Sequence, residues 1–272
     1  MSLLDEMAVH FRIAPADLLR IIDTAPARYK QYTIPKRSGG VRTIAQPSRE
    51  VKLLQRYIME TKLSAFPIHD AATGYIKRRN IFYNAQCHQN ARVILKLDFE
   101  NFFPSIKVND WTTLLSRHRP EAIERRDLRL YQQLLFWGQQ SPIPRCLSIG
   151  APTSPMLSNI ILFRLDTLLF RAARNVRYTR YADDITVSGD SIEAVRNFED
   201  DVVRILPLIR SPALTLNDTK RGIYLKGQKR MVTGLKITPV GAISIGRDRK
   251  SLISVMLHKV TLGEADVKHL NY

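Results

Sequence analysis

The sequence VRYTRYADDITVS, residues 176–188, contains two short β-prone runs separated by a pair of adjacent aspartates. Two such runs joined by a short polar link predict a β-hairpin with Asp183 and Asp184 at its tip. Adjacent carboxylates repel each other, and a fold tolerates them most easily beside a cation, for which Mg²⁺ is the usual choice with oxygen ligands. An ordinary acidic turn explains the four residues YADD equally well when they are taken alone. The rest of the chain decides between these two interpretations.

A third candidate acid ends another strand-like segment. Residues 93–98 read VILKLD, a short and mostly apolar run typical of a central, buried strand. Asp98 at its end is costly to bury unless it is paired or bound to a metal ion. If this strand lies beside the hairpin in one antiparallel sheet, Asp98, Asp183 and Asp184 form a carboxylate cluster. Such a cluster is the minimal apparatus for phosphoryl transfer with two metal ions.

The composition of the chain restricts its class and its partners. Its 272 residues suit one large domain or two moderate ones, and 44% hydrophobic content supports a core. A net charge of +17 and a pI of about 10.1 favour a polyanionic partner, with nucleic acid as the first candidate. No apolar run approaches the ~20 residues that span a bilayer, and the N-terminus lacks the pattern of a signal peptide. Because Cys87 and Cys146 also lack metal-ligand spacing, we expect reduced thiols, a cytoplasmic location and no membrane contact.

Apolar periodicity and turn residues predict the remaining elements. Helices are expected over residues 2–11, 15–25, 48–64, 109–119, 121–138, 156–174 and 191–206. Residues 29–47 predict a hairpin with the basic, glycine-containing turn KRSGG at 36–40, and residues 214–220 predict a strand followed by a loop. His88 has no second ligand at metal spacing, so we expect a hydrogen-bonded structural role for it.

Two basic segments are candidates for binding phosphate groups. The segment from Lys220 to Lys259 carries ten Lys and Arg residues against a single acid, Asp248, which favours a surface that binds a nucleic-acid backbone. The Lys and Arg side chains of the turn at 36–40 have the chemistry to hold a triphosphate. A solvated loop with no ligand explains this turn as well.

The order of the motifs resembles that of reverse transcriptases, and most closely those of bacterial retrons. The series consists of RTIAQPSRE at 42–50, Asp98 with FFPSI at 102–106, GAPTSP at 150–155 with SN at 158–159, YADD at 181–184, NDTK at 217–220 and GLKI at 234–237. Two further short elements, NAQCH at 84–88 and VTG at 232–234, are similar to elements found in retron enzymes. The tetrapeptide YADD alone is weak evidence, whereas the ordered series across residues 28–245 is strong evidence.

The resemblance implies a right-hand polymerase fold of the α+β class, with fingers, a palm built on an antiparallel sheet, and a short helical thumb. It assigns the N-terminal helices and fingers to residues 1–92, the palm to residues 93–240 with part of the fingers at about 109–150, and the thumb to residues 241–272. The implied activity is RNA-directed DNA polymerisation with two Mg²⁺ ions, in which part of a structured non-coding RNA is copied into single-stranded DNA (msDNA). Priming from a guanosine 2′-hydroxyl, a separate effector protein and a role in anti-phage defence are further implications of the family.

The resemblance also assigns the catalytic and metal-binding roles. Asp98 and Asp183 would be the principal metal ligands, Asp184 would support them, and the carbonyl of Phe99 would be a further ligand. Lys220 matches the lysine that protonates the leaving pyrophosphate.

Substrate roles follow from the same matches. Arg42 and a lysine, Lys36 or Lys30, would hold the triphosphate of the incoming dNTP. Phe103 matches the aromatic residue that excludes a ribose 2′-hydroxyl, and Gly150 would pack against the new base pair. On the primer and template side the corresponding residues are Tyr181, Lys229, Arg230 and Gly234.

Two features depart from the family pattern. Ile149 stands where a glutamine usually precedes the glycine of the GAPTSP motif, so nucleotide selection is expected to differ. The chain ends at Tyr272, earlier than retron thumbs usually end, so the thumb is either minimal or truncated. Two alternatives remain open: another bacterial reverse transcriptase, of the group II intron or diversity-generating type, and an RNA-binding scaffold with vestigial activity. The NAQCH and VTG elements argue against the first alternative, and the intact acids argue against the second.

Overall fold

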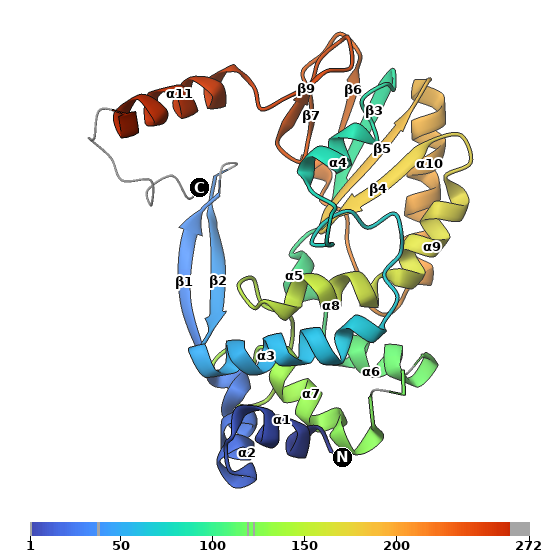
Figure 1. Cartoon of the computed structure of the whole chain (residues 1–272). Helices are drawn as coiled ribbons and strands as arrows, with labels where there is room; N and C mark the ends of the chain where they lie inside the picture. The colour runs from blue at the N-terminus through green and yellow to red at the C-terminus, as the bar shows by residue number, and fades with distance from the viewer. Residues whose placement is uncertain (1, 37–38, 119, 122, 262–272) are drawn as a thin grey trace.

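The computed structural model describes residues 2–36, 39–118, 120–121 and 123–261, and within these ranges three antiparallel sheets are set among helices (Figure 1). The strands are β1 (Tyr29–Pro35), β2 (Val41–Pro47), β3 (Val93–Asp98), β4 (Arg177–Tyr181), β5 (Asp184–Gly189), β6 (Gly222–Leu225), β7 (Arg230–Val232), β8 (Leu235–Ile237) and β9 (Ile243–Ser244). The helices are α1 (Leu3–Phe11), α2 (Pro15–Thr24), α3 (Arg49–Thr61), α4 (Ile81–Gln86), α5 (Phe102–Ser105), α6 (Val108–Arg117), α7 (Leu128–Leu135), α8 (Thr153–Ile161), α9 (Phe163–Ala172), α10 (Ile192–Ile205) and α11 (Arg247–Thr261). None of the helices in the described ranges is both long enough and apolar enough to cross a membrane.

The central sheet has the strand order β4-β5-β3-β6, and its two faces have different neighbours. Successive side chains of a strand point to opposite faces. On β3, Val93, Leu95 and Leu97 therefore enter the main core, where α10 packs against β3 and β5. Ile94 points the other way, into a smaller apolar cluster formed with α4 and the β7-β8-β9 sheet. Asp98 shares the alternation of Ile94 and so belongs to the face that α10 does not cover.

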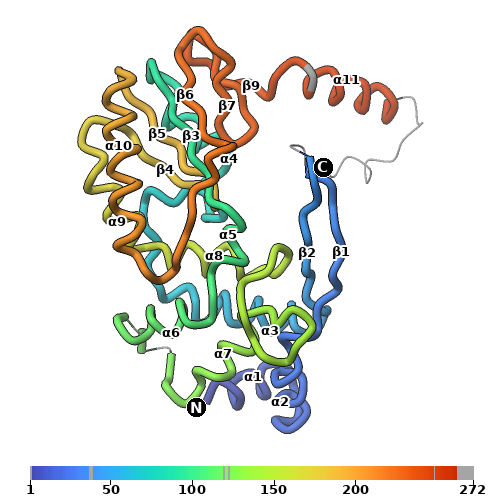
Figure 2. Tube along the Cα trace, turned by 180° about the vertical axis from the view of Figure 1, so that it is seen from behind, coloured from blue at the N-terminus to red at the C-terminus, as the bar shows by residue number. Residues whose placement is uncertain are grey.

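The N-terminal half packs around α3. Helices α1, α2 and α7 lie together at the base of the molecule in Figure 1, and the β1–β2 hairpin rises from this base. Ser48 ends the hairpin and caps α3, because its hydroxyl accepts a hydrogen bond from the backbone N–H of Val51. The hairpin projects on the same side as α11, and the view from behind shows the same arrangement (Figure 2).

Two of the predicted helices differ from the structure. The expected helix over 156–174 is divided into α8 and α9, with Leu162 between them, and the break coincides with the point at which Asn159 and Asp166 both reach Arg180. The expected helix over 121–138 is shortened to α7, and residue 122 lies outside the described residues. Helix α7 ends at Leu135 because the backbone of Trp137 pairs with that of Cys146. The remaining predicted helices agree with the structure to within about three residues at each end, the usual uncertainty of helix limits.

The segment 214–220 was also only partly predicted. Leu216 forms a single bridge with Phe99 in place of the expected strand, and a short 3-10 helix over Asp218–Lys220 follows. Its cap is Asn217, whose side chain accepts a hydrogen bond from the N–H of Thr219. This local fold directs Lys220 toward the end of β3.

Candidate active site

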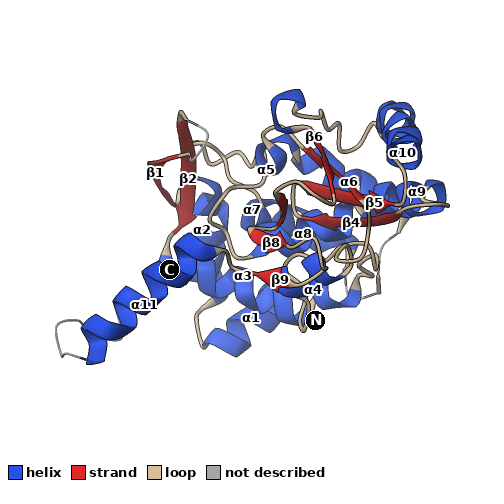
Figure 3. Cartoon of the chain, turned by 90° about the horizontal axis from the view of Figure 1, so that it is seen from above, coloured by secondary structure: helices blue, strands red, loops and turns tan. Residues whose placement is uncertain are grey.

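The structure brings the three predicted carboxylates together at one end of the central sheet. Strand β3 pairs antiparallel with β5 in a register that sets Asp98 directly opposite Asp184. Asp183 lies in the two-residue link between β4 and β5, and its carbonyl accepts a hydrogen bond from the N–H of Phe99 at 3.1 Å. The prediction that these acids lie on adjacent strands of one antiparallel sheet is therefore confirmed. Figure 3, seen from above, shows β4 and β5 side by side in this sheet.

The link that carries Asp183 has a strained backbone and a close neighbour. Ala182 has φ 54°, a left-handed conformation that costs an L-residue about 1–2 kcal/mol. The segment 71–75 lies alongside it, since the N–H of Arg180 donates to the carbonyl of Ala71 and the N–H of Thr73 donates to the carbonyl of Arg180, both at 2.8 Å. A Cβ atom on Gly74 would lie 3.1 Å from the backbone nitrogen of Ala182, so a larger residue there would press on the link.

A buried arginine connects this link to helices α8 and α9. Arg180 has no solvent exposure, and its Nε and Nη2 donate to the carboxylate of Asp166, also fully buried, at 2.9 and 2.6 Å. Its Nη1 donates to the carbonyl of Ala182 and to Oδ1 of Asn159, both at 3.1 Å. Asn159 in turn donates to the carbonyl of Gly74 at 2.9 Å. The backbone beside Asp183 is thus held by a hydrogen-bonded network without contact to solvent.

Sequence reasoning missed the role of Arg180 and Asp166. The signal was present, because alternation along β4 places Arg180 on the same inward face as Tyr178. Likewise, Asp166 interrupts the apolar face of the helix predicted over 156–174. A charge of each sign on two inward faces predicts a buried ion pair.

The opposite face of the hairpin is braced by His88. Its Nδ1 lies 2.7 Å from Oγ of Ser188, and its Nε2 lies 2.7 Å from Oγ1 of Thr179. Thr179 also donates to Oδ1 of Asn84 at 2.7 Å. Burial lowers the pKa of His88 to about 3, with a further lowering by the charge of Arg177, so the imidazole is neutral. The predicted structural role of His88 is confirmed.

The two short retron-like elements contact each other. Ala85 of the NAQCH element and Val232 of the VTG element share one apolar cluster with Ile94 of β3. The hydroxyl of Thr233 donates to the carbonyl of Ile81 at 3.1 Å. Both elements therefore support the central sheet from the face that carries the carboxylates.

Lysines neutralise part of the negative charge of the cluster. Lys220 Nζ lies 2.6 Å from Oδ1 of Asp98, and Lys96 Nζ lies 3.6 Å from Oδ1 of Asp184. Burial nevertheless raises the pKa of Asp98 to about 6, since the lowering by Lys220 only partly offsets burial and the neighbouring charge of Asp183. Burial, and then the charge of Asp184, also raises the pKa of Asp183. The cluster holds more negative charge than its own lysines neutralise.

The carboxylate oxygens and the excess negative charge of the cluster suit a divalent cation. Carboxylate oxygens are the ligands that Mg²⁺ prefers, and an added cation would favour the ionised forms of Asp98 and Asp183. Among the described residues, no three His, Cys, Asp or Glu side chains are already gathered into a metal-holding group. The carboxylates of Asp98, Asp183 and Asp184 nevertheless have the chemistry that a Mg²⁺ ion requires.

The residues assigned to the triphosphate lie on the β1–β2 hairpin. Arg42 pairs with Ile34 across the hairpin, so the two share a face, and alternation along β1 extends that face to Lys30 and to Lys36 at the strand end. All three basic residues are exposed. Against the larger raising effects of burial and of Asp184, the positive charge of Arg42 makes a minor contribution that lowers the pKa of Asp183. Arg37 and Ser38 of the predicted turn lie outside the described residues.

The two aromatic candidates next to Asp98 differ in exposure. Phe99 is buried and stacks on Phe102, with ring centroids 5.9 Å apart. Phe103 is half-buried and meets Phe102 edge to face at 5.2 Å. Only Phe103 keeps part of its ring accessible beside the carboxylates.

Gly150 docks the GAPTSP segment against β2. It has φ 128°, and a Cβ atom there would lie 2.9 Å from the carbonyl oxygen of Ala45. The N–H of Ala45 donates to the carbonyl of Ile149 at 2.9 Å. Because this contact uses the backbone of Ile149, it does not depend on whether isoleucine or glutamine occupies the position.

The candidates for primer and template contact are divided between surface and interior. Tyr181 lies next to Tyr75, with ring centroids 5.8 Å apart, and the carbonyl of Gly234 accepts a hydrogen bond from Nη1 of Arg249 at 3.2 Å. Lys229 is exposed. Arg230 is instead buried, and its guanidinium donates to the carbonyls of Ala91 at 2.6 Å and Thr238 at 2.7 Å. The expectation that Arg230 contacts nucleic acid is corrected, because its side chain is buried and both terminal nitrogens of the guanidinium donate within the fold.

Comparison with known proteins agrees with this geometry. Residues 34–238 match the family model described as reverse transcriptase (RNA-dependent DNA polymerase). The chain belongs to the reverse transcriptase family. It is 35% identical over 258 residues to the retron Ec83 reverse transcriptase of Escherichia coli, a match that covers 92% of this chain and 82% of that protein. It is 33% identical over 278 residues to the retron Ec86 reverse transcriptase of Escherichia coli, covering 99% of this chain and 82% of that protein.

These relatives identify a retron-type reverse transcriptase, and hence an RNA-directed DNA polymerase. A third relative, the retron Mx65 reverse transcriptase of Myxococcus xanthus, is 34% identical over 251 residues, or 87% of this chain and 57% of that protein. The predicted family and enzyme class are confirmed.

Solved telomerase structures show the fold. Apo telomerase from Candida tropicalis has a TM-score of 0.52 at 14% identity and covers 80% of this reverse transcriptase and 55% of that chain. Telomerase from Candida albicans has a TM-score of 0.53 at 12% identity and covers 89% and 52%. This reverse transcriptase spans about half the length of those chains. The expected right-hand polymerase fold is confirmed.

Proposed function

We propose that this reverse transcriptase copies part of a structured non-coding RNA into single-stranded msDNA by Mg²⁺-dependent nucleotidyl transfer. The observation that carries the proposal is the register of β3 and β5, which sets Asp98 opposite Asp184 with Asp183 beside them. The net charge of +17 and the match to retron enzymes support an RNA partner.

In the proposed mechanism, Asp98 and Asp183 would hold two Mg²⁺ ions, with support from Asp184 and the carbonyl of Phe99. When bound, the ions activate an attacking hydroxyl and stabilise the charge on the triphosphate. Lys220, whose Nζ lies 2.6 Å from Oδ1 of Asp98, gives a proton to the leaving pyrophosphate in this proposal. Lys220 would be freer to leave Asp98 if that carboxylate held a metal ion.

Substrate contacts complete the proposal. Arg42 and Lys36 bind the triphosphate from the β1–β2 hairpin, since guanidinium and ammonium groups pair well with phosphate. Phe103 excludes a ribose 2′-hydroxyl with the accessible part of its ring. Gly150 holds its segment close to the new base pair.

Contacts with nucleic acid are assigned to the primer side of the cluster. Tyr181 and Gly234 lie at the primer end, and Lys229 binds backbone phosphate. The proposed division is fingers at residues 1–92, palm at 93–240 with part of the fingers at about 109–150, and thumb at 241–272, of which residues 262–272 lie outside the described residues. Priming from a guanosine 2′-hydroxyl, a separate effector protein, a cytoplasmic location and a role in anti-phage defence are parts of the same proposal, supported by the retron relatives.

The nucleic acid that the protein carries in its own host tests this proposal. The wild-type protein and an Asp183→Asn/Asp184→Asn variant would be purified, and the bound nucleic acid extracted and treated with RNase. The proposal predicts a short DNA of fixed length that is joined to RNA before treatment and is absent from the variant. Bound RNA without DNA in the wild-type sample would contradict it and favour a scaffold role. DNA without a joined RNA would contradict the priming step.

A further inference from the structure

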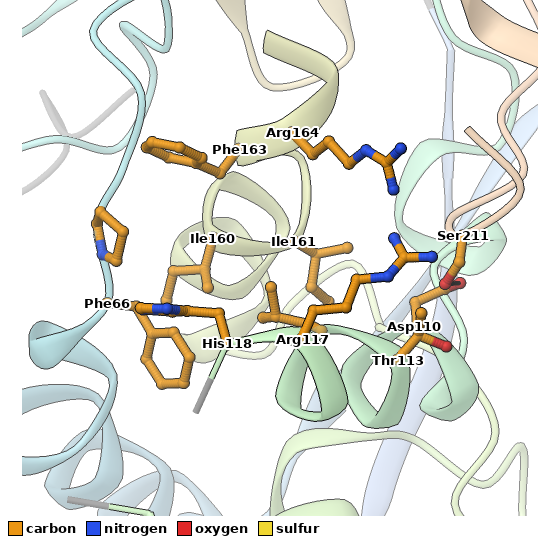
Figure 4. A pocket seen from close by; sticks show the side chains of 12 residues that line it. Phe66, Asp110, Thr113, Arg117, His118, Ile160, Ile161, Phe163, Arg164 and Ser211 are labelled. Carbon is orange, nitrogen blue, oxygen red and sulfur yellow. Dashed lines mark hydrogen bonds between the residues drawn. The ribbon is translucent and has the colours of Figure 1, made fainter. Parts of the chain in front are cut away.

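A cavity of about 360 Å³ lies on a part of the molecule that the polymerase site does not use. It is enclosed by α6, the junction of α8 and α9, and the loop at Phe66 and Pro67 (Figure 4). In Figures 1 and 2, α6 and α9 lie on the opposite side of the molecule from the β1–β2 hairpin and α11. A partner seated in this cavity would leave the catalytic face open.

The inner end of the cavity is apolar and has firm walls. Ile160 and Ile161 form its floor, and both are almost fully buried in the core. Phe66 packs against Trp111 with ring centroids 5.4 Å apart, and Phe163 meets the ring of His69 at 5.6 Å. Because these rings are already held by neighbours, a large apolar side chain can enter with little ordering of the wall.

The outer end carries two cations. Arg117 of α6 and Arg164 of α9 extend in the same direction, away from Phe66 and Phe163 (Figure 4). Both are exposed, and neither forms a hydrogen bond or ion pair with any residue in the described part of the chain. The carboxylate of Asp110 in the same wall accepts from the hydroxyl of Ser211 and from the N–H of Lys107, both at 2.6 Å. The lining therefore offers two guanidinium groups to a carboxylate from elsewhere.

We propose that this cavity docks an acidic segment of a protein partner, which inserts one large apolar side chain between Phe66 and Phe163 and pairs adjacent carboxylates with Arg117 and Arg164. Charge complementarity supports this occupant, since paired guanidinium groups bind carboxylates in a fixed geometry and the chain as a whole is strongly cationic. The volume lies within the range of pockets that enclose a single drug-sized group.

A nucleotide of an RNA fits this cavity less well than an apolar side chain does. Arginines also bind phosphate, but a nucleobase that follows its phosphate inward would bring its polar edges against Ile160 and Ile161. Buried polar groups without partners cost about 1–3 kcal/mol each. An apolar side chain has no such groups.

Methyl NMR with two short peptides tests this inference. The isoleucine methyl groups of the full chain would be labelled, and the signals of Ile160 and Ile161 assigned by substitution with valine. The probes are acetyl-Glu-Asp-Phe-Asp-Glu-amide and the same peptide with alanine in place of phenylalanine. The expected result is a saturable shift of both methyl signals by the phenylalanine peptide and about tenfold or more weaker binding of the alanine peptide, as loss of a buried aromatic side chain predicts.

Two charge-reversal variants distinguish binding of the peptide in the cavity from nonspecific attraction of an acidic peptide to a basic protein. Arg117→Glu/Arg164→Glu should weaken peptide binding at least about tenfold and leave RNA-templated synthesis unchanged. Arg171→Glu/Arg196→Glu makes the same change of charge at exposed positions on α9 and α10 and should leave the methyl shifts nearly unaltered.

Three results would overturn the docking inference. They are the absence of a saturable shift at about 2 mM phenylalanine peptide, equal binding of the two peptides, and equal or tighter binding of a short RNA that produces the same methyl shifts. The last result would assign the cavity to nucleic acid. None of these outcomes bears on polymerase activity, so the test is independent of the proposed function.

Discussion

The β4–β5 hairpin and the β1–β2 hairpin differ in how far the rest of the chain covers them. In β4–β5, Tyr178, Thr179 and Arg180 are buried, and so is every residue from Ile185 to Ser188. In β1, every residue after Tyr29 is exposed. One hairpin is held on both faces by side chains from other elements, and the other is anchored mainly at its base.

This difference corresponds to the work proposed for each hairpin. Reacting groups must be held close to their productive geometry, and a fully satisfied buried polar network provides that rigidity. Arg180 and His88 supply such networks on the two faces of β4–β5. A triphosphate that arrives from solution can instead be met by exposed, flexible cations such as Arg42, at a cost in side-chain entropy.

The largest effect on activity is expected from a substitution in the β4–β5 hairpin. Replacing Asp183 with Asn should lower the single-turnover rate of nucleotide incorporation by on the order of 10³-fold, because an amide neither carries the charge nor binds the metal ions as a carboxylate does. RNA binding should be nearly unchanged. Rapid-quench kinetics and filter binding measure both quantities, with the exposed Asp190→Asn as a matched control. Loss of folding, seen by circular dichroism, would make the residue structural instead.

The hydrogen-bonded network around Arg180 can be removed without leaving a buried, unpaired charge. Arg180→Met alone should destabilise the protein by about 3–5 kcal/mol, since it leaves the buried charge of Asp166 without its counter-ion and with the Tyr178 hydroxyl as a remaining donor. Arg180→Met combined with Asp166→Leu should recover much of that stability, because both charges are removed.

The activity of this double variant separates the effect of Arg180 on the position of the β4–β5 link from its effect on folding. It lacks the donor to the carbonyl of Ala182, so kcat should remain about 10- to 100-fold low while KM for dNTP changes little. Urea unfolding and steady-state kinetics give the two readouts. Full recovery of kcat together with stability would show that Arg180 does not position the link.

A substitution in the exposed β1–β2 hairpin should weaken dNTP binding and leave stability nearly unchanged. Arg42→Ala should raise KM for dNTP by about tenfold, since a charge-assisted hydrogen bond to phosphate is lost. The free energy of unfolding should change by less than about 0.5 kcal/mol, because the side chain is exposed. Arg49→Ala, at an exposed position at the start of α3, serves as the control for charge. An unchanged KM would remove Arg42 from the triphosphate site.

A smaller effect concerns stability against pH. The pKa of His88 is lowered to about 3 in the fold, so below its ordinary pKa of 6.5 the unfolded chain binds a proton that the native protein does not. Stability is therefore full above that value and falls with decreasing pH, by about 1.4 kcal/mol between about pH 7.5 and about pH 5.5. Urea unfolding at both pH values measures this difference. A His88→Gln variant should lose most of the pH dependence attributable to this residue, and an identical dependence in both proteins would contradict the neutral, buried imidazole.

The smallest effect distinguishes two neighbouring cations of the C-terminal region. Lys229→Glu should weaken RNA binding a few-fold and reduce the slope of log K against log salt by about one unit. Arg230→Met should leave that slope unchanged and reduce the free energy of unfolding, because its guanidinium bonds two carbonyls inside the fold. Salt titrations and unfolding curves decide both, and a changed slope for Arg230→Met would return that residue to the RNA surface.

Local sequence patterns predicted much of the fold and the centre of the site. The apolar run VILKLD predicts a buried strand that ends at Asp98, and YADD predicts a hairpin with Asp183 at its tip, because each signal lies within a few residues. That the two lie side by side in one sheet followed from the resemblance to reverse transcriptases and not from a local pattern. The partners of His88 were beyond reach, since Thr179 and Ser188 are separated from it by 91 and 100 residues. The break at Leu162 has no local signal either, because the residues on its two sides that contact Arg180, Asn159 and Asp166, meet an arginine of another element, β4.

A count of basic residues along the chain gave the wrong role for Arg230, whereas the alternation of side chains along its strand indicates the right one. Arg230 was counted with the surface cations, yet it shares an inward strand face with Val232, and both are buried. Arg180 was likewise passed over, although it shares a buried face with Tyr178. An arginine on the inward face of a short strand indicates an internal hydrogen-bonding role before it indicates a ligand.

The most direct test of the account is incorporation of labelled dNTP by the purified ribonucleoprotein. The protein would be isolated with its bound RNA, stripped of metal with EDTA, and supplied with labelled dNTPs with or without Mg²⁺. The account predicts label only with Mg²⁺, in a product that RNase reduces to DNA, and none with the Asp183→Asn protein. Bound RNA with no incorporation by the wild-type protein, or equal incorporation by the variant, would contradict the role assigned to the carboxylates of the β4–β5 hairpin and β3.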